Sequence, residues 1–326
     1  PVREARFRKE LLNSLSSGSA VIDCGDTQAL FQFRSEGGHA MIRIPGLLKV
    51  AAVLALDFLA VSSLFNDPSI GALAVGAIAL YVFFGGYLAL FQEGATRWDQ
   101  LPAYEVAHLS DAKRQLTEDV SHASAVDISR LKVYLISADD SMQATAYGAN
   151  CVSVSRGTLD NADPMTLNAV LAHEISHILN FDPEFNRAVL ATIFVLCGVI
   201  SVLSFAFVAV IFLIFLVCGW LGSWLGVMAF KGTSKVSQGI FSLLQKGIVV
   251  LYQTVMSVLS RSAEYRCDLY SASLDRSYGL QLAHFLTYAA PETNRQLTLT
   301  EALYRTHPPT PKRVARLEAY VNSANR

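Results

Sequence analysis

The stretch AVLATIFVLCGVISVLSFAFVAVIFLIFLVCGWLGSWLGVMAF, residues 188–230, decides the fold class of this chain. It runs for 43 residues without a formally charged side chain, whereas about 20 helical residues cross the hydrocarbon core of a bilayer. Residues 70–92 form a second such stretch, of 23 residues. Both stretches are long enough to span a membrane, so the sequence predicts a polytopic membrane protein.

Two weaker apolar stretches can complete a pair of membrane hairpins. Residues 47–65 contain Asp57 near their middle, and residues 239–260 are interrupted by three polar side chains. Turn-forming residues 66–69 separate the first pair, and we expect the polar residues 231–235 to separate the second. The sequence therefore predicts four transmembrane helices. We interpret Asp57 as lying near an interface or pairing with Lys49 or with a polar group of another helix, rather than marking a transport pathway.

The composition agrees with this class and excludes others. Hydrophobic residues make up 52% of the 326 residues and charged residues only 16%, below the roughly 25% of soluble domains. The net charge of −1 offers no basic stripe of the kind that nucleic-acid binding needs. The five cysteines are widely spaced and form no CxxC pattern, which favours a reducing compartment.

The distribution of lysine and arginine predicts the orientation in the membrane. Six of them precede residue 47 and none lies in the turn at 66–69, so the positive-inside bias places the N-terminus in the cytoplasm. More than forty polar or mixed residues precede the first apolar stretch, so we expect no cleaved signal peptide.

The residues between the hairpins show the patterns of a small soluble domain. Residues 104–123 have helical periodicity, and residues 131–136 and 151–155 alternate like strands, which predicts a short antiparallel sheet. The pair Asp163-Pro164 is typical of a helix start, since aspartate caps and proline fits the first helical position. The helix that follows is expected to end before Pro183.

That helix contains the sequence His173-Glu174-Ile175-Ser176-His177. Residues four apart lie on one face of a helix, so both imidazoles can reach one metal ion. Glu174 is placed to hold a water molecule beside the ion and to accept its proton. The alternative is an ordinary amphipathic helix with two histidines, but the well-formed helix start favours a hydrolytic zinc site.

The search for a third ligand is constrained by composition. Residues 185–263 contain no Asp, Glu or His, which excludes a glutamate about twenty residues downstream of the histidine pair. The position of a third histidine in a longer motif is occupied by Pro183. Asp182 and Glu184 are close in sequence but lie where the helix ends, so they are poorer candidates.

The best candidate is Glu264, the first carboxylate after the long apolar block. Asp268 follows four residues later, on the same face of an expected helix, where it can orient a ligating histidine. The competing interpretation is a solvated charged face that also includes Arg261 and Arg266.

If His173, His177 and Glu264 share one ion, the chain between them must cross the membrane an even number of times. One crossing within 188–230 and a second at 239–260 satisfy this, and we favour that arrangement, with 219–230 as an interfacial or re-entrant piece. A hairpin wholly within 188–230 also satisfies it, because 43 helical residues reach about twice the core thickness.

Three blocks of the chain resemble the integral-membrane zinc metallopeptidases of the HtpX type, which are relatives of the CAAX prenyl proteases. They are LAHEISHILNFD (171–182), SRSAEYRCD (260–268) and THPPTPKRVARL (306–317), with a weaker likeness across 143–163. The resemblance covers roughly residues 47–326. It implies a mainly α fold with four transmembrane helices and a small α+β catalytic domain of the zincin (gluzincin) type with a short antiparallel sheet.

The resemblance also implies one zinc ion per chain and a role for each matching residue. The implied zinc ligands are His173, His177 and Glu264, and Glu174 is the implied general base and acid. His307 and Arg313 are implied to act near the tetrahedral intermediate, and Asn180, Asp182 and Asp268 to support the ligands. An extended peptide would pair with the strand region 143–154, through Ala144, Thr145, Ala146, Val152 and Val154.

We therefore expect a membrane-embedded zinc endopeptidase that cleaves membrane or misfolded proteins at the cytoplasmic face of a bacterial inner membrane. The alternatives are a prenyl-protein protease, which has more spans, and a non-catalytic adaptor or transporter with a structural zinc, against which Glu174 weighs. The expected organisation is a cytoplasmic extension (1–46), a hairpin (47–92), the first catalytic part (93–187), a second hairpin (188–260) and the second catalytic part (261–326).

Overall fold

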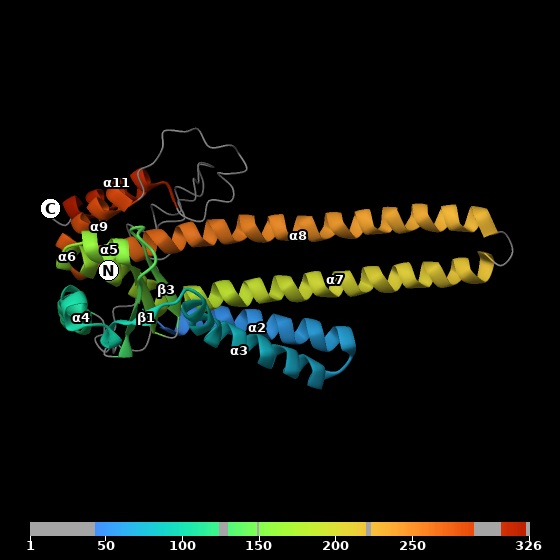
Figure 1. Ribbon diagram of the computed structural model, residues 1–326, viewed down its shortest axis with the longest axis horizontal. Coiled ribbons are helices and arrows are strands. Elements are labelled where there is room, and N and C mark those ends of the chain that lie inside the picture. Colours follow the sequence, from blue (N-terminus) through green and yellow to red (C-terminus); the bar gives the residue numbers. More distant parts are fainter. Residues whose placement is uncertain (1–42, 124–129, 149, 220–222, 290–307, 324–326) are drawn as a thin grey trace, which may run out of the picture. The chain divides into compact units, whose positions relative to one another are not determined.

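The computed structural model describes residues 43–123, 130–148, 150–219, 223–289 and 308–323 (Figure 1). The expected extension 1–46 therefore falls almost entirely outside the described residues. The helices are α2 (Arg43–Phe65), α3 (Pro68–Gln92), α4 (Ala103–Ala123), α5 (Arg156–Asn161), α6 (Pro164–Leu179), α7 (Asp182–Gly219), α8 (Ser223–Leu274), α9 (Arg276–Ala289) and α11 (Thr310–Ser323). The strands are β1 (Thr96–Arg97), β2 (Lys132–Ile136), β3 (Ala144–Gly148) and β4 (Cys151–Ser155), and a short 3-10 helix η2 covers Trp98–Gln100.

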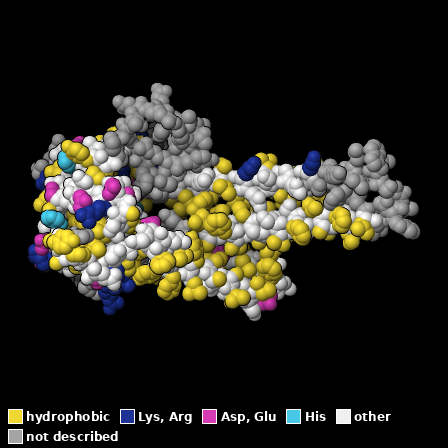
Figure 2. All heavy atoms as spheres, viewed as in Figure 1, with side chains coloured by type: hydrophobic (Ala, Val, Ile, Leu, Met, Phe, Trp, Pro, Cys, Tyr) yellow, Lys and Arg dark blue, Asp and Glu magenta, His cyan; other side chains and the backbone are white. Residues whose placement is uncertain are grey.

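Four helices in the described part of the chain are long and apolar enough to cross a membrane. The candidate spans are Gly46–Phe65, Pro68–Gln92, Asp182–Ile214 and Lys235–Leu274. Figure 2 shows hydrophobic side chains gathered over these helices, while most charged side chains on that face gather where α4, α6, α9 and α11 lie. Leu73 and Phe205 are each 77% exposed, as expected for side chains that face lipid. The prediction of four transmembrane helices is confirmed.

The first hairpin turns where the sequence predicts and the second does not. Asp67 caps α3, and its carboxylate accepts a hydrogen bond of 2.8 Å from the backbone N–H of Ser69. Residues 231–235, by contrast, lie inside α8, which begins at Ser223, whereas α7 ends at Gly219. A single glycine costs a helix only about 1 kcal/mol, and lysine is a good helix former, so this polar stretch does not end a long helix.

Residues 223–230 form the start of α8, and their position relative to a membrane stays a prediction. The same helix continues beyond residue 260 and carries Glu264. Helix α8 therefore contains both a candidate membrane span and a candidate metal ligand. Figure 1 shows α7 and α8 running side by side.

The sheet is mixed rather than antiparallel, with strand order β1-β2-β4-β3. Strands β2 and β4 are parallel, with Val133 opposite Val152, while β3 pairs antiparallel with β4. The expectation of a purely antiparallel sheet was wrong because β3 lies on the far side of β4. After β2 the chain forms β3, which becomes an edge strand of the sheet. It then returns to form β4 between β2 and β3.

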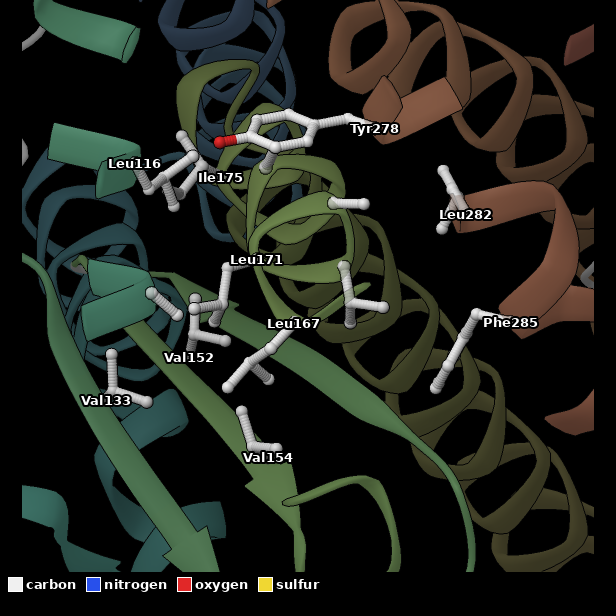
Figure 3. Packing of buried hydrophobic residues seen from close by; sticks show 14 of the residues in the cluster. Leu116, Val133, Val152, Val154, Leu167, Leu171, Ile175, Tyr278, Leu282 and Phe285 are labelled. Carbon is white, nitrogen blue, oxygen red and sulfur yellow. The ribbon is translucent and has the colours of Figure 1, made fainter. Parts of the chain in front are cut away.

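Helix α6 is buried on nearly all sides, which fixes the direction of its side chains. Leu167, Leu171 and Ile175 belong to the main hydrophobic core together with residues of β2 and β4, and Tyr278 of α9 closes it from another side (Figure 3). Helix α4 adds a fully buried stripe at helical spacing, made up of Leu109, Ala112, Leu116 and Val120.

Membrane helices α3 and α7 hold the edge strand β3 in place. At Gly86 the backbone of α3 lies so close to β3 that an added Cβ would be 2.2 Å from the carbonyl oxygen of Tyr147. Arg187 of α7 donates to the carbonyl oxygens of Val82 (2.7 Å) and Tyr147 (2.9 Å). The outer edge of the sheet is therefore anchored to the membrane helices.

Asp57 lies buried in the helix bundle, where it accepts a hydrogen bond of 3.0 Å from the hydroxyl of Thr192 on α7. This geometry agrees with the interpretation that Asp57 pairs with a polar group of another helix.

Candidate active site

Helix α6 presents the His173–His177 sequence from a well-defined start. Asp163 caps the helix by accepting a hydrogen bond of 2.7 Å from the backbone N–H of Thr166, and Pro164 occupies the first helical position. The helix ends at Leu179, and α7 begins at Asp182. The imidazole rings of His173 and His177 lie 5.0 Å apart between their centroids, on the same face.

Glu264 of α8 lies opposite both imidazoles. Its carboxylate oxygens lie 3.4 Å from Nε2 of His173 and 3.7 Å from Nε2 of His177. A tetrahedral zinc ion with bonds of about 2.0–2.1 Å separates its ligand atoms by roughly 3.4 Å. One donor atom from each of the three residues lies within 4.8 Å of the others, so this donor set fits a single zinc ion.

The second ring nitrogen of each histidine faces a carboxylate. Nδ1 of His173 lies 3.0 Å from Oδ1 of Asp268, and Nδ1 of His177 lies 2.9 Å from Oδ2 of Asp182. Such partners fix the tautomer of a ligating histidine and aim its Nε2 atom at the metal. Asp268 and Asp182 thus lie where a supporting role requires them. Asn180 instead donates to the backbone oxygen of Ser176 at 2.8 Å and supports the end of α6.

Two arginines hold these carboxylates. Arg313 of α11 is buried and donates to both oxygens of Asp268, at 2.8 and 2.6 Å, and its Nη1 lies 3.0 Å from Glu264. Arg266 of α8 contacts Asp182. Arg313 therefore contacts Asp268 and the ligand candidate Glu264, and its implied role near the tetrahedral intermediate stays a prediction. His307 lies outside the described residues.

The sequence interpretation missed Arg266, which it assigned only to a possible solvated face. Arg266 lies two residues after Glu264, and helical spacing puts it on a different face of α8. Its partner Asp182 follows His177 by five residues, across the break between α6 and α7. The contact depends on that break, which local spacing does not encode.

Burial and neighbouring charges shift the pKa values of the site. Burial raises the pKa of Glu174, and the two histidines and a hydrogen bond from the backbone N–H of Ala146 partly oppose that rise. Burial lowers the pKa of His173, but the carboxylates of Asp268 and Glu264 outweigh it and raise this pKa to about 10. Because a metal binds neutral imidazole, protons and metal compete for this histidine.

Strand β3 is the outer edge of the sheet next to Glu174. It contains Ala144, Thr145 and Ala146, whose role in pairing with a peptide stays a prediction. Val152 and Val154 do not share that role, since β4 pairs on both sides and their side chains are fully buried. Expecting them at a peptide-binding edge was wrong, because they are core residues.

We predict that Asp182→Asn lowers zinc affinity by about 10–100-fold, as is typical when a residue that orients a ligating histidine is changed. The amide cannot accept the Nδ1 proton of His177 with the strength of a carboxylate, and Arg266 loses its charged partner. Competition with a chromophoric chelator measures the affinity. Asp160→Asn is the matched control, because Asp160 is exposed and pairs along its own helix with Arg156, at 2.9 Å. Equal affinities for the two variants would contradict the orienting role.

Comparison with known proteins adds independent findings. Residues 110–321 match the model of peptidase family M48. The chain is 25% identical over 297 residues to a protease HtpX homolog of Limosilactobacillus reuteri (strain DSM 20016), covering 81% of this chain and 92% of that protein. It is 26% identical over 302 residues to protease HtpX of Tolumonas auensis, covering 83% and 95%. The crystal structure of S. mikatae Ste24p is similar with a TM-score of 0.45 and 16% identity, covering 82% of this chain and 62% of that one.

Proposed function

The chain belongs to peptidase family M48 and is a membrane metalloprotease, and we propose that it is a zinc-dependent endopeptidase with Glu174 as its general base. The observation that carries the proposal is the convergence of His173, His177 and Glu264 from two helices on one small volume. A helix that continues a membrane span supplies the third of these residues.

In this proposal three residues hold the metal and one moves the proton. A zinc ion held by His173, His177 and Glu264 supplies Lewis acidity, which lowers the pKa of water to about 7 in favourable sites and polarises a carbonyl group. Glu174 accepts one proton from the attacking water and passes it to the amine released when the peptide C–N bond breaks. The burial that raises the pKa of Glu174 makes its carboxylate a stronger base for this transfer.

The substrate is proposed to lie along β3. An extended peptide can add a strand to this edge through main-chain hydrogen bonds to Ala144–Ala146. The backbone N–H of Ala146 also donates to Glu174, so the edge strand and the general base are linked directly. Pairing at β3 would bring the scissile peptide bond next to the carboxylate of Glu174, which is proposed to transfer the proton from the attacking water to the leaving amine.

The proposed location is the inner membrane of a bacterium, with the catalytic residues in the cytoplasm and membrane or misfolded proteins as substrates. Lysines and arginines support this orientation, since several follow the end of α3 and none lies in the turn between α2 and α3. The named bacterial HtpX relatives support the setting.

Metal removal tests the function. We expect 1,10-phenanthroline to abolish casein cleavage by the purified full chain, and Zn²⁺ added after removal of the chelator to restore it. The protein as purified should hold about one zinc per chain, measured by inductively coupled plasma mass spectrometry. The isomer 1,7-phenanthroline, which cannot chelate, is the control. Cleavage that survives 1,10-phenanthroline would contradict a metal-dependent peptidase.

A further inference from the structure

A basic cavity of about 550 Å³ lies where the chain leaves α3 and enters the sheet. Four cationic residues line it: Arg97, Lys113, Arg130 and Lys132. Among the described residues of this lining, Asp99 is the one acidic residue, and it contacts Arg97 at 2.5 Å. The described lining therefore carries a net positive charge, which favours an anionic ligand.

The cavity lies at the end of a membrane span. Tyr87 lines it from the last turns of the candidate span Pro68–Gln92, and Trp98 lines it from η2, shortly after that span. Tyrosine and tryptophan are enriched where the polar headgroups of a bilayer meet its hydrocarbon core. Their position indicates that the cavity opens at headgroup depth.

Each of these two aromatic rings contacts one of the lysines that line the cavity. Nζ of Lys132 donates to the hydroxyl of Tyr87 at 3.3 Å and lies 5.2 Å from the centre of its ring. Nζ of Lys113 lies 5.1 Å from the centre of the Trp98 ring. These contacts restrain two flexible side chains, so less conformational entropy is lost when an anion binds.

The cavity is separate from the proposed catalytic site. Its strand residues come from β1 and β2, whereas the edge next to Glu174 is β3, and β1 and β3 are opposite edges of the sheet. The side chains assigned to metal and proton chemistry lie on α6 and α8. The positive charge of the cavity is thus not explained by catalysis.

We propose that this cavity binds the phosphodiester group of an anionic phospholipid. Arginine and lysine supply the charge-assisted hydrogen bonds that phosphate oxygens accept, and basic cavities beside membrane helices are suited to lipid headgroups. A soluble phosphate has the same anionic chemistry. The aromatic residues at the end of α3 favour the lipid, because its acyl chains can then lie along the exposed apolar face of that helix, which includes Leu88 and Phe91.

Native mass spectrometry of the full chain in neutral detergent tests the proposal with phosphatidylglycerol and phosphatidylcholine as probes. We expect one phosphatidylglycerol to bind in preference to phosphatidylcholine, and Lys113→Gln to weaken its binding about fivefold, the effect of one lysine near an anionic surface. Lys132→Gln should weaken it similarly. The matched control is Arg114→Gln, which removes the same charge from the next residue of α4, where the side chain is 69% exposed and pairs with Glu118.

Three outcomes would overturn the proposal. Equal weakening by Lys113→Gln and Arg114→Gln would indicate general charge attraction without a site. Equal binding of the two lipids would exclude selection for an anion. Displacement of phosphatidylglycerol by millimolar glycerol phosphate would assign the cavity to a soluble phosphate instead of a lipid. Thermal unfolding of each variant shows that it is folded, so a loss of binding can be assigned to the cavity.

Discussion

Glu174→Gln is expected to lower kcat/KM for casein by about 10³-fold or more, while the protein keeps about one zinc per chain. Positioned general bases contribute typically about 10²–10⁴-fold, and glutamine cannot accept the proton of the attacking water. The amide has nearly the same shape as the carboxylate and can still accept the hydrogen bond from the backbone N–H of Ala146. Zinc content should persist because the donor atoms that converge belong to His173, His177 and Glu264.

The two measurements separate three roles for Glu174. Loss of cleavage with full zinc content supports a general base. Loss of zinc together with cleavage would make Glu174 a ligand, and cleavage within tenfold of the unchanged protein would remove it from the mechanism. Glu118→Gln provides the matched control, since this glutamate is 63% exposed on α4 and pairs with Arg114 on the same helix.

Features that arise from local pattern could be predicted from the sequence. The four membrane helices follow from long apolar stretches, because a span needs about 20 apolar residues wherever they occur. The start of α6 follows from Asp163 and Pro164, and the shared face of His173 and His177 follows from the helical repeat. None of these features depends on contacts with residues that are far away in the sequence.

Strand pairing could not be predicted from the alternation of polar and apolar residues. In β4, Ser153 and Ser155 alternate with Val152 and Val154 as in a strand with one solvent-facing side, yet both serines are buried. The hydroxyl of Ser155 donates to the carbonyl oxygen of Ser141, which satisfies a polar group inside the sheet. A central strand with hydrogen-bonded serines therefore has the same pattern as an exposed edge strand.

The second hairpin shows a different limit of sequence interpretation. A polar stretch between two apolar ones was taken as the turn, yet α8 passes through residues 231–235 without a break. Polarity alone does not end a helix, since lysine is a good helix former and a single glycine costs only about 1 kcal/mol. The same continuity places Glu264 on α8. The sequence pointed to Glu264 through the absence of other carboxylates and through the family resemblance, but it did not predict that this residue continues a membrane helix.

Glu264→Gln is the second change with a large expected effect, because it removes the ligand candidate that α8 contributes. We expect zinc affinity to fall by more than about 100-fold, since losing a support of a ligating histidine already costs about 10–100-fold. Chelator competition measures the affinity, and casein cleavage should fall with zinc occupancy. Glu318→Gln is the control, because Glu318 is exposed on α11.

The contacts of Arg313 allow a ligand role of Glu264 to be distinguished from a structural one. In Glu264→Gln, Arg313 keeps its two hydrogen bonds to Asp268, so the chelator-treated variant should unfold at nearly the same temperature as the chelator-treated unchanged protein. If Glu264 served mainly to neutralise Arg313, the variant would lose stability without zinc and keep its zinc affinity, because a buried charge that loses its partner costs about 3–5 kcal/mol. The two interpretations predict opposite changes in two independent measurements, so one variant decides between them.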